Sequence, residues 1–296
     1  MTVLARRFRA GRSRSTAALL VAAMSCGLVL ALTGWSRLTE TSGSPARESP
    51  GSADRLLGLP RAAPGAFTLM QMNVCLSGLA GCYDASAYPA AVREAVALVR
   101  AARPDAVTLN EACRRDAARI ARRTGYHLRF STVIYGDEQL RCVDPDGRGL
   151  FGDAVLTRAP IVASENRAFE AQAGLEERRW LCLTTRLEQV VCTAHLSTRR
   201  TTTAASANDA QCAELSAVLA RHAAARTVAF GGDVNRLGSC APDGLWSRTD
   251  GSADQAPGVQ HVYGSGISLR SPSAEVLPAG NSDHDVLLVR ARLAGR

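Results

Sequence analysis

Amphipathic stretches of the chain have the spacing of helices. In residues 88–102 the apolar side chains recur at the spacing that places them on one face of a helix. Pro104 follows this stretch and ends the pattern, because a proline cannot continue a helix. Similar stretches occur later, and Gly125 provides a stop signal for one of them. The pattern predicts helices over 88–102, 113–124 and 206–222.

Short runs of β-branched, aliphatic and aromatic residues lie between the helices and predict strands. Two of these runs, 180–185 and 190–195, flank a short turn and predict an antiparallel hairpin. Residues 135–148 are polar and bounded by turn-forming residues, which predicts a loop. This mixture of elements predicts a mixed sheet arrangement. Strands are expected over 67–73, 105–109, 127–132, 152–157, 180–185, 190–195, 227–232, 259–263 and 286–293.

Polar residues follow several predicted strands at the points where the strands end. Strand ends gathered at one rim of a sheet are a common place for a functional site. If the backbone stays extended beyond Gly231 and Gly232, the side chains of Asp233 and Asn235 point the same way. A turn is the alternative, because Gly, Asp and Asn all favour turns. The polar residues at predicted strand ends are Asn73, Glu111, His195, Asp233, Asn235, Asp283 and His284.

The positive charge of the chain is concentrated at its N-terminus. The 296 residues carry a formal net charge of +8, and the first 46 supply +5 of it through six Arg and one Glu. The remaining +3 is compatible with a polyanionic substrate but does not require one. The length suits one large globular domain or two small ones.

Basic residues precede an apolar run at the N-terminus. Five Arg lie just before the apolar residues 16–35, which is typical of a secretory signal, and the run is long enough to span a bilayer if it is retained. We expect 1–35 to be a signal peptide or a membrane anchor, 36–65 a flexible linker and 66–296 one domain. The protein is therefore expected to be secreted, or held at the cell surface through residues 16–35.

The cysteines support an oxidising compartment. Eight of the nine lie after the apolar run, and an even number is typical of disulfides in an exported domain. A zinc site is disfavoured, because the chain has no Cys-x2-Cys pair. A hairpin turn centred on Leu187 places Cys182 directly opposite Cys192. Cys75 with Cys82 would close a short loop, which leaves Cys113 with Cys142 and Cys212 with Cys240 by elimination.

The polar strand ends belong to six short motifs, which in chain order are Gln71-Met-Asn73, Leu109-Asn-Glu111, Gly152-Asp-Ala-Val-Leu, Thr193-Ala-His-Leu, Gly232-Asp-Val-Asn235 and Ser282-Asp-His284. In these motifs the chain resembles the endonuclease/exonuclease/phosphatase superfamily, whose members look like deoxyribonuclease I. The resemblance extends over residues 67–293. It implies an α/β (α+β) fold in which two mixed β-sheets form a four-layer sandwich with flanking helices.

The resemblance also implies metal-dependent hydrolysis of a phosphoester. Carried over by position, Glu111, Asn73 and Asp283 are the implied metal ligands. Carboxylate and amide oxygens suit Mg²⁺, which takes few protein ligands and keeps several waters. Mn²⁺ and Ca²⁺ are the alternative ions.

Four further residues have implied catalytic roles. Asp233 would orient or deprotonate the attacking water, and Asn235 would hold a phosphate oxygen. His195 and His284 would donate to phosphoryl oxygens and stabilise the charge that develops there. In-line displacement at phosphorus needs this kind of positioning and charge neutralisation more than covalent chemistry.

Two positions depart from the family pattern. The family often has Asn where this chain has Asp153. It also often has Asp at the position of Gln260, where it supports the final histidine, here His284. A Gln can orient an imidazole but cannot stabilise its cation as an anion does. This departure argues weakly against high turnover and leaves the implied metal site intact.

Relatives of this kind act on DNA, RNA or phospholipids. Predicted export and disulfides favour an extracellular nuclease or a sphingomyelinase-like enzyme over intracellular classes. No exposed apolar hairpin is evident for a lipid enzyme, so a nuclease that acts on DNA or RNA is the first expectation, with Arg141, Arg148 and Arg199 as the candidate substrate-binding residues. A sphingomyelinase-like or phosphoinositide-type lipid phosphoesterase is the first alternative. A catalytically weak binding module on the same scaffold is the second. The sequence indicates no obligate protein partner.

Overall fold

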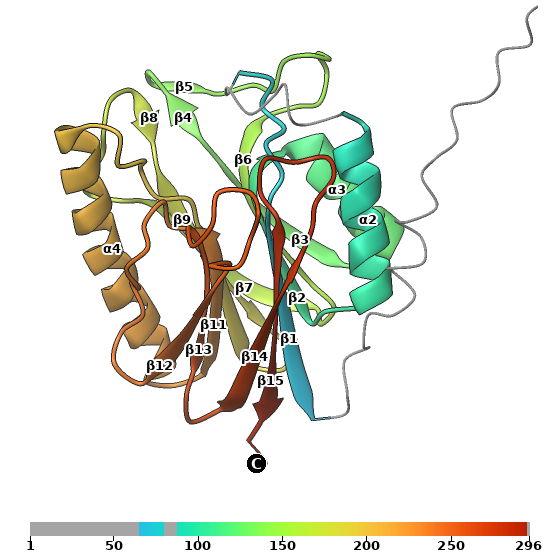
Figure 1. Cartoon of the computed structure of the whole chain (residues 1–296), viewed down its shortest axis with the longest axis vertical. Helices are drawn as coiled ribbons and strands as arrows, with labels where there is room; N and C mark the ends of the chain where they lie inside the picture. Colours follow the sequence, from blue (N-terminus) through green and yellow to red (C-terminus); the bar gives the residue numbers. More distant parts are fainter. Residues whose placement is uncertain (1–64, 80–87, 295–296) are drawn as a thin grey trace, which may run out of the picture. The chain divides into compact units, whose positions relative to one another are not determined.

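Two six-stranded mixed sheets face each other in the computed structural model, which describes residues 65–79 and 88–294 (Figure 1). In spatial order, the first sheet contains β14 (Leu269–Leu277), β15 (Val286–Leu293), β1 (Ala66–Asn73), β2 (Ala106–Cys113), β6 (Phe151–Thr157) and β3 (His127–Thr132). The second contains β12 (Leu245–Thr249), β13 (Gln260–Ser265), β11 (Thr227–Asp233), β10 (Gln189–Ala194), β9 (Arg179–Thr185) and β7 (Ile161–Ala168).

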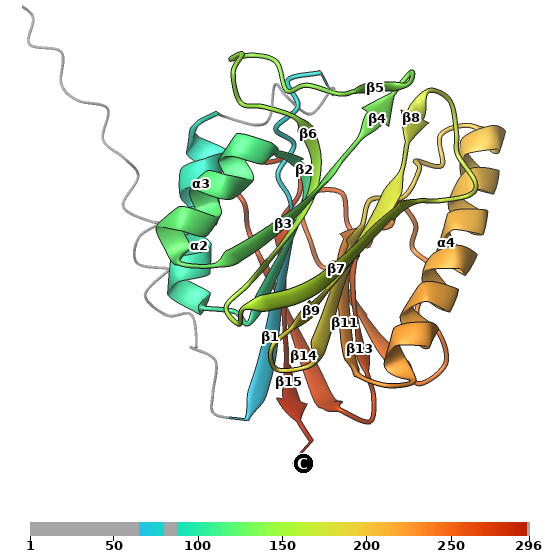
Figure 2. The ribbon, with the colours of Figure 1, turned by 180° about the vertical axis from the view of Figure 1, so that it is seen from behind.

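Helices cover the outer faces of both sheets, so the described residues form four layers (Figure 2). Helices α2 (Ala90–Ala102) and α3 (Arg114–Thr124) pack on the first sheet, and α4 (Thr202–Ala223) packs on the second. A small third sheet contains β5 (Glu138–Gln139), β4 (Ile134–Tyr135) and β8 (Glu176–Glu177). The expected fold class, a four-layer sandwich, is confirmed.

Apolar side chains fill the space between the two sheets. Leu69 and Leu287 from the first sheet share a cluster with Leu183, Val191 and Ala229 from the second. Separate apolar clusters lie beneath α2 and α3 on one side and beneath α4 on the other. Burial of this apolar surface holds the two sheets in a fixed relative position.

Two pairs of parallel strands bring their carboxyl ends to one edge of the sandwich. In the first sheet β1 runs parallel to β2, with Asn73 beside Asn110. In the second sheet β10 runs parallel to β11, and His195 forms an isolated parallel bridge with Asp233. Side chains that follow these strands therefore meet at the same edge.

The three helices agree with the prediction to within a few residues, but several strands were missed. Strand β7 is an edge strand with mostly exposed positions, so its residues show no apolar run. Strands β12 and β14 contain mainly polar or partly exposed residues. The prediction of a loop over 135–148 is wrong at its start, where β5 and the end of β4 pair.

Three predicted disulfides are confirmed among the described residues. Cys182 and Cys192 face each other in the hairpin register, with their Cα atoms 4.0 Å apart. The other two are Cys113–Cys142 and Cys212–Cys240. Disulfides are typical of proteins in oxidising compartments. The fourth predicted disulfide joins Cys75 to Cys82, and Cys82 lies outside the described residues.

The predicted signal peptide or anchor, 1–35, and almost all of the predicted linker, 36–65, also lie outside the described residues. Within the part that the structure describes, no helix has the length and apolar character needed to cross a membrane.

Gly231 provides a test of how closely the sheets pack. A Cβ atom there would overlap the Thr108 hydroxyl and lie 2.7 Å from Leu69 Cδ2 in the opposite sheet. We expect Gly231→Ala to lower the free energy of unfolding by about 1–3 kcal/mol, because overpacking forces neighbouring groups to move. Urea denaturation measures the change. Gly280→Ala is the control, since its Cβ would meet only the Glu94 side chain, at 3.7 Å. Equal stability of the two variants would contradict the close packing.

Candidate active site

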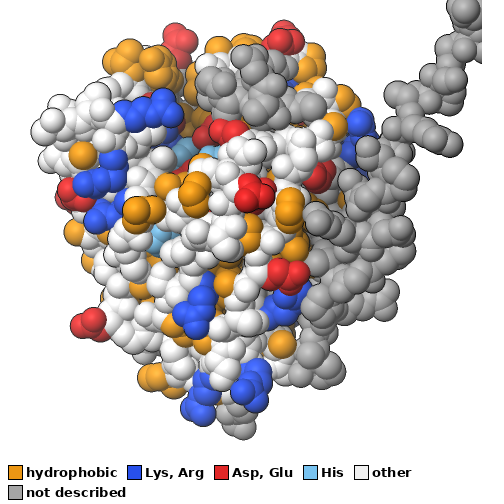
Figure 3. All heavy atoms as spheres, in the orientation of Figure 1, with side chains coloured by type: hydrophobic (Ala, Val, Ile, Leu, Met, Phe, Trp, Pro, Cys, Tyr) orange, Lys and Arg blue, Asp and Glu red, His pale blue; other side chains and the backbone are white. Residues whose placement is uncertain are grey.

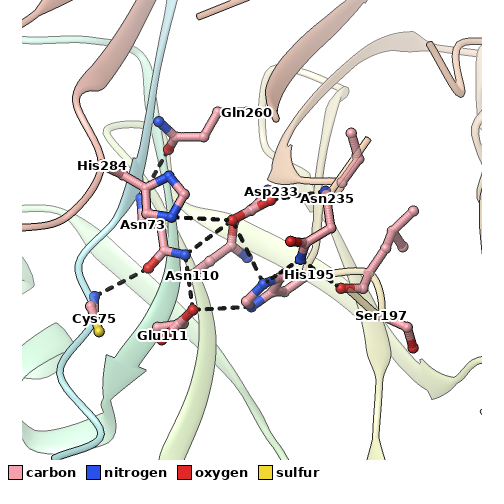
Figure 4. A network of polar contacts seen from close by, with 12 residues as sticks. Asn73, Cys75, Asn110, Glu111, His195, Ser197, Asp233, Asn235, Gln260 and His284 are labelled. Carbon is pink, nitrogen blue, oxygen red and sulfur yellow. Dashed lines mark hydrogen bonds and ion pairs between the residues drawn. The ribbon is translucent and has the colours of Figure 1, made fainter. Parts of the chain in front are cut away.

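Polar side chains from both sheets converge on Asp233 at the edge where the parallel strands end (Figure 4). Asp233 Oδ2 accepts a hydrogen bond from Asn73 Nδ2 at 3.1 Å. The same oxygen lies 3.7 Å from Nε2 of His195 and 3.7 Å from Nε2 of His284. The structure thus brings together one carboxylate, two imidazoles and an amide that are far apart in the sequence.

The backbone after Asp233 does not stay extended but turns, which is the alternative that the Gly, Asp and Asn residues favoured. Strand β11 ends at Asp233, and Asn235 has a φ of 51°, in the left-handed region that Asn tolerates better than most residues. The Asn235 N–H donates to Asp233 Oδ1 at 2.9 Å. Its side-chain Nδ2 lies 3.0 Å from His195 Nε2 and donates to the Leu196 carbonyl. Asn235 therefore reaches the same cluster through a turn.

Glu111 enters the site from an irregularity in β2. The register with β6 shifts between Leu109 and Ala112, and Glu111 has a φ of 55°. A left-handed conformation is strained for Glu, and strain of this kind is found mainly where a side chain must be aimed. Glu111 Oε1 accepts from Asn73 Nδ2 at 3.0 Å and lies 3.9 Å from His195 Nδ1. The bulge thus turns Glu111 toward the cluster.

Burial dominates the electrostatics of the cluster. It raises the pKa of Glu111, an effect that the hydrogen bond from Asn73 and the charge of Arg178 oppose. Burial also lowers the pKa of His195 well below its ordinary value, with further lowering from Arg178 and His284. Burial therefore disfavours the carboxylate form of Glu111 and the protonated form of His195. The neighbouring charges do not offset this cost of burial.

Gln260, which stands where the family often has a supporting Asp, forms its hydrogen bonds with groups other than the His284 imidazole. Its Oε1 accepts from the backbone N–H of Asn73, and its Nε2 donates to Asp250 Oδ2 and to the Asp285 carbonyl. Because these bonds occupy the amide, Gln260 acts as a link within the sandwich. The His284 Nδ1 atom is buried and has no hydrogen-bond partner among the described residues.

Carboxylate oxygens of the kind that a hard divalent cation binds lie near this edge. They belong to Glu111, Asp233 and Asp283; the charges of Asp233 and Asp283 act on Glu111, and Asp283 Oδ1 is buried without a hydrogen-bond partner among the described residues. Asn73 is less suited to be a ligand in this arrangement. Its Nδ2 faces both Glu111 and Asp233, while its Oδ1 accepts the N–H of Cys75.

Asp153 is the other residue that departs from the family pattern. It lies in β6 and contacts the cluster through Asn110. Burial raises its pKa to about 7, opposed by the hydrogen bond from Asn110 and by Arg178. Asn110 Nδ2 donates to Asp153 Oδ1 at 2.9 Å. No role was predicted for Asn110. The signal that could have revealed it is the pair of amide residues, Gln71 and Asn110, in two neighbouring strands whose positions are almost all buried.

The predicted substrate-binding arginines differ in how accessible they are. Arg148 is only 3% exposed, and it forms an ion pair with Asp116 at 3.3 Å and donates to the Val143 carbonyl at 2.9 Å. The prediction that Arg148 contacts substrate is wrong, because its charge is used inside the protein. Arg199 pairs with Asp209 on the surface, and Arg141 is exposed.

The surface view shows acidic and histidine side chains together on one face, with hydrophobic and cationic side chains nearby (Figure 3). Arg178 is a largely buried cation whose charge acts on the cluster. The residue is 9% exposed and forms an ion pair with Glu176 at 3.1 Å. Its charge influences Glu111 and His195. Arg178 therefore supplies positive charge beside the cluster.

Comparison with known proteins identifies similar sequences and folds. The model of the Endonuclease/Exonuclease/phosphatase family matches residues 71–284. This span includes every residue of the cluster, from Asn73 to His284. No curated protein matches the chain.

Several solved structures share the fold. An endonuclease/exonuclease/phosphatase from Beutenbergia cavernae is 20% identical with a TM-score of 0.57, over 78% of this chain and 72% of that one. The human Nocturnin catalytic domain with bound sulfate is 18% identical with a TM-score of 0.59, over 78% and 94%. D. rerio TDP2 with a single-strand DNA product is 14% identical with a TM-score of 0.52, over 77% and 99%. Identities this low support the fold alone.

The ion pair of Arg148 gives a direct test of its structural role. We expect Arg148→Met to lower the free energy of unfolding by about 3–5 kcal/mol, because Asp116 is left as a buried charge without its partner. Chemical denaturation followed by circular dichroism measures the loss. Arg141→Met is the matched control at an exposed site and should change stability by less than about 0.5 kcal/mol. A stable Arg148→Met protein would contradict this assignment.

Proposed function

Because the chain belongs to the endonuclease/exonuclease/phosphatase family and is thus a hydrolase acting on phosphoester bonds, we propose that the cluster around Asp233 is its catalytic centre. The observation that carries the proposal is the convergence of Asn73, His195 and His284 within 4 Å of one Asp233 oxygen. In this proposal the centre works with a bound Mg²⁺ ion, or with Mn²⁺ or Ca²⁺ in its place.

Glu111 and Asp283 would hold the metal ion. When bound, the ion supplies positive charge that neutralises the phosphoryl oxygens. The raised pKa of Glu111 supports this role, because a cation beside a buried carboxylate removes the cost of its ionisation. The buried Asp283 Oδ1, which accepts no hydrogen bond from the described residues, supports it as well.

Asp233 would orient the attacking water and accept its proton, since a carboxylate offers acceptors only. Its Oδ1 is held by the N–H of Asn235, which leaves Oδ2 facing the two imidazoles. His195 and His284 would donate to the phosphoryl oxygens, and Asn235 would hold one of those oxygens after releasing His195. Apart from this release, hydrogen bonds already hold Asp233 and Asn235 in place, so they need little reorganisation.

Nucleic acid is the substrate that we propose first. Support comes from the similarity in fold to a TDP2 structure that contains a single-strand DNA product. The exposed Arg141 and Arg199 would meet the phosphate backbone. The predicted secretion or membrane anchoring through residues 16–35, ahead of a domain spanning 66–296, would place such an enzyme outside the cell.

An amphipathic phosphodiester, such as a membrane lipid, is the second candidate. Large apolar side chains are exposed in three loops and in β4, and a lipid could contact them. Leu237 follows Asn235 closely in the chain, and Leu175 precedes Arg178. The exposed fractions are 59% for Leu79, 48% for Tyr135, 63% for Leu175 and 77% for Leu237.

Metal removal tests the proposed centre. We expect EDTA to abolish hydrolysis of bis(p-nitrophenyl) phosphate, and Mg²⁺ to restore it. Glu111→Gln should lower kcat at least about 100-fold, because the carboxylate would hold the ion that stabilises developing charge. Glu275→Gln is the control, since this acid pairs with Arg290 away from the site. Full activity in EDTA, or in the Glu111 variant, would rule out the proposed metal ligand.

A substrate panel separates the two candidates. Plasmid, single-stranded DNA, RNA, sphingomyelin vesicles and phosphoinositide vesicles are incubated with the purified protein and Mg²⁺. We expect cleavage of nucleic acid, with a rate that falls steeply as salt rises, because phosphate contacts are screened. Turnover of the lipid vesicles alone would favour the second candidate. Metal-dependent turnover of none of them would support the binding module instead.

A further inference from the structure

A row of buried polar side chains lies in the first sheet, directly behind the proposed catalytic centre. Gln71, Thr108 and Asn110 are fully buried, and Asp153 is 4% exposed. Thr108 donates to Gln71 Oε1 at 2.5 Å, and Gln71 Nε2 donates to Asn110 Oδ1 at 2.8 Å. Buried polar groups are costly unless they are paired, so this row is a defined network rather than a loose group.

Asn110 joins this network to the second sheet. Its Oδ1 accepts the backbone N–H of Asp233 at 2.8 Å, and its Nδ2 donates to Asp153 Oδ1 at 2.9 Å. Figure 4 shows Asn110 beside Glu111 and Asp233. One amide therefore touches the backbone of the central carboxylate and directly precedes Glu111 in the β2 bulge.

The orientation of the Asn110 amide follows from its partners. A backbone N–H can only donate, so Asp233 requires an oxygen on its side of Asn110. The Asp153 carboxylate accepts the amide nitrogen on the other side. A flipped amide would place two donors together at Asp233 and two oxygens together at Asp153. Asp153 thus holds the nitrogen end of the Asn110 amide, while the Asp233 N–H and Gln71 Nε2 hold its oxygen end.

We propose that Asp153 is a positioning residue for the proposed hydrolysis: it orients Asn110, and Asn110 holds the Asp233 backbone in register with Glu111. The inference rests on the proposed function for its catalytic meaning. Its structural part, the dependence of the Asp233 N–H on Asp153, does not. An Asn at position 153 retains an acceptor for Asn110, whereas Ala retains none.

Three variants test the inference. Asp153→Ala should lower kcat about 10- to 100-fold with little change in KM, because the groups that orient reacting residues contribute on this scale. Asp153→Asn should recover most of the lost kcat. Asn110→Leu should lose as much kcat as Asp153→Ala, because it removes the bond to Asp233 directly. Equal loss in Asp153→Ala and Asp153→Asn, or full kcat in Asp153→Ala, would overturn the proposal.

A second measurement separates this inference from the proposed function. Hydrogen exchange of the Asp233 amide, followed by NMR in the full chain, reports its bond to Asn110 without any substrate. Exchange should accelerate at least about tenfold in Asp153→Ala, which corresponds to about 1.4 kcal/mol, and remain slow in Asp153→Asn. If the wild type hydrolyses nothing, the proposed function fails, yet this result still decides the role of Asp153. Unchanged protection in Asp153→Ala overturns it.

Discussion

The polar bridge between the two sheets is the interaction on which the site depends. Apolar packing brings the sheets together over most of their area, but at one edge the contact is made by hydrogen bonds. Asn73 donates to Asp233, the Asp233 N–H donates to Asn110, and Gln260 accepts the N–H of Asn73. A buried polar group without a hydrogen-bond partner is costly, so all three of these bonds must form in the folded protein. Together they fix how the two sheets are aligned at this edge.

The same burial sets the electrostatic character of the site. It raises the pKa of Glu111 and lowers that of His195, so both groups are pushed toward their neutral forms. Burying ionisable groups such as Glu111 and His195 does not stabilise the folded protein. A bound cation and an anionic substrate would reverse both effects, which is why a concentration of buried ionisable groups at strand ends is typical of a functional site.

The two departures from the family pattern have different structural meanings. Gln260 is fully engaged in linking the sheets, and His284 lacks the support that an acid would give it. Asp153 preserves a hydrogen bond to Asn110 that an Asn could also accept, so this replacement keeps the geometry and adds an ionisable group. Only the first departure removes a contact from the proposed catalytic residues.

Local pattern alone determined the helices, most central strands, the hairpin disulfide between Cys182 and Cys192 and the order of the polar motifs. These features depend on residues close together in the sequence, where periodicity and turn chemistry act. Tertiary structure decided the left-handed turn at Asn235, the burial of Arg148 and the partners of Gln260. Each of these depends on groups contributed by distant segments. Edge strands such as β7 were missed for a related reason, since hydrogen bonding to a neighbour, and not an apolar run, makes them strands.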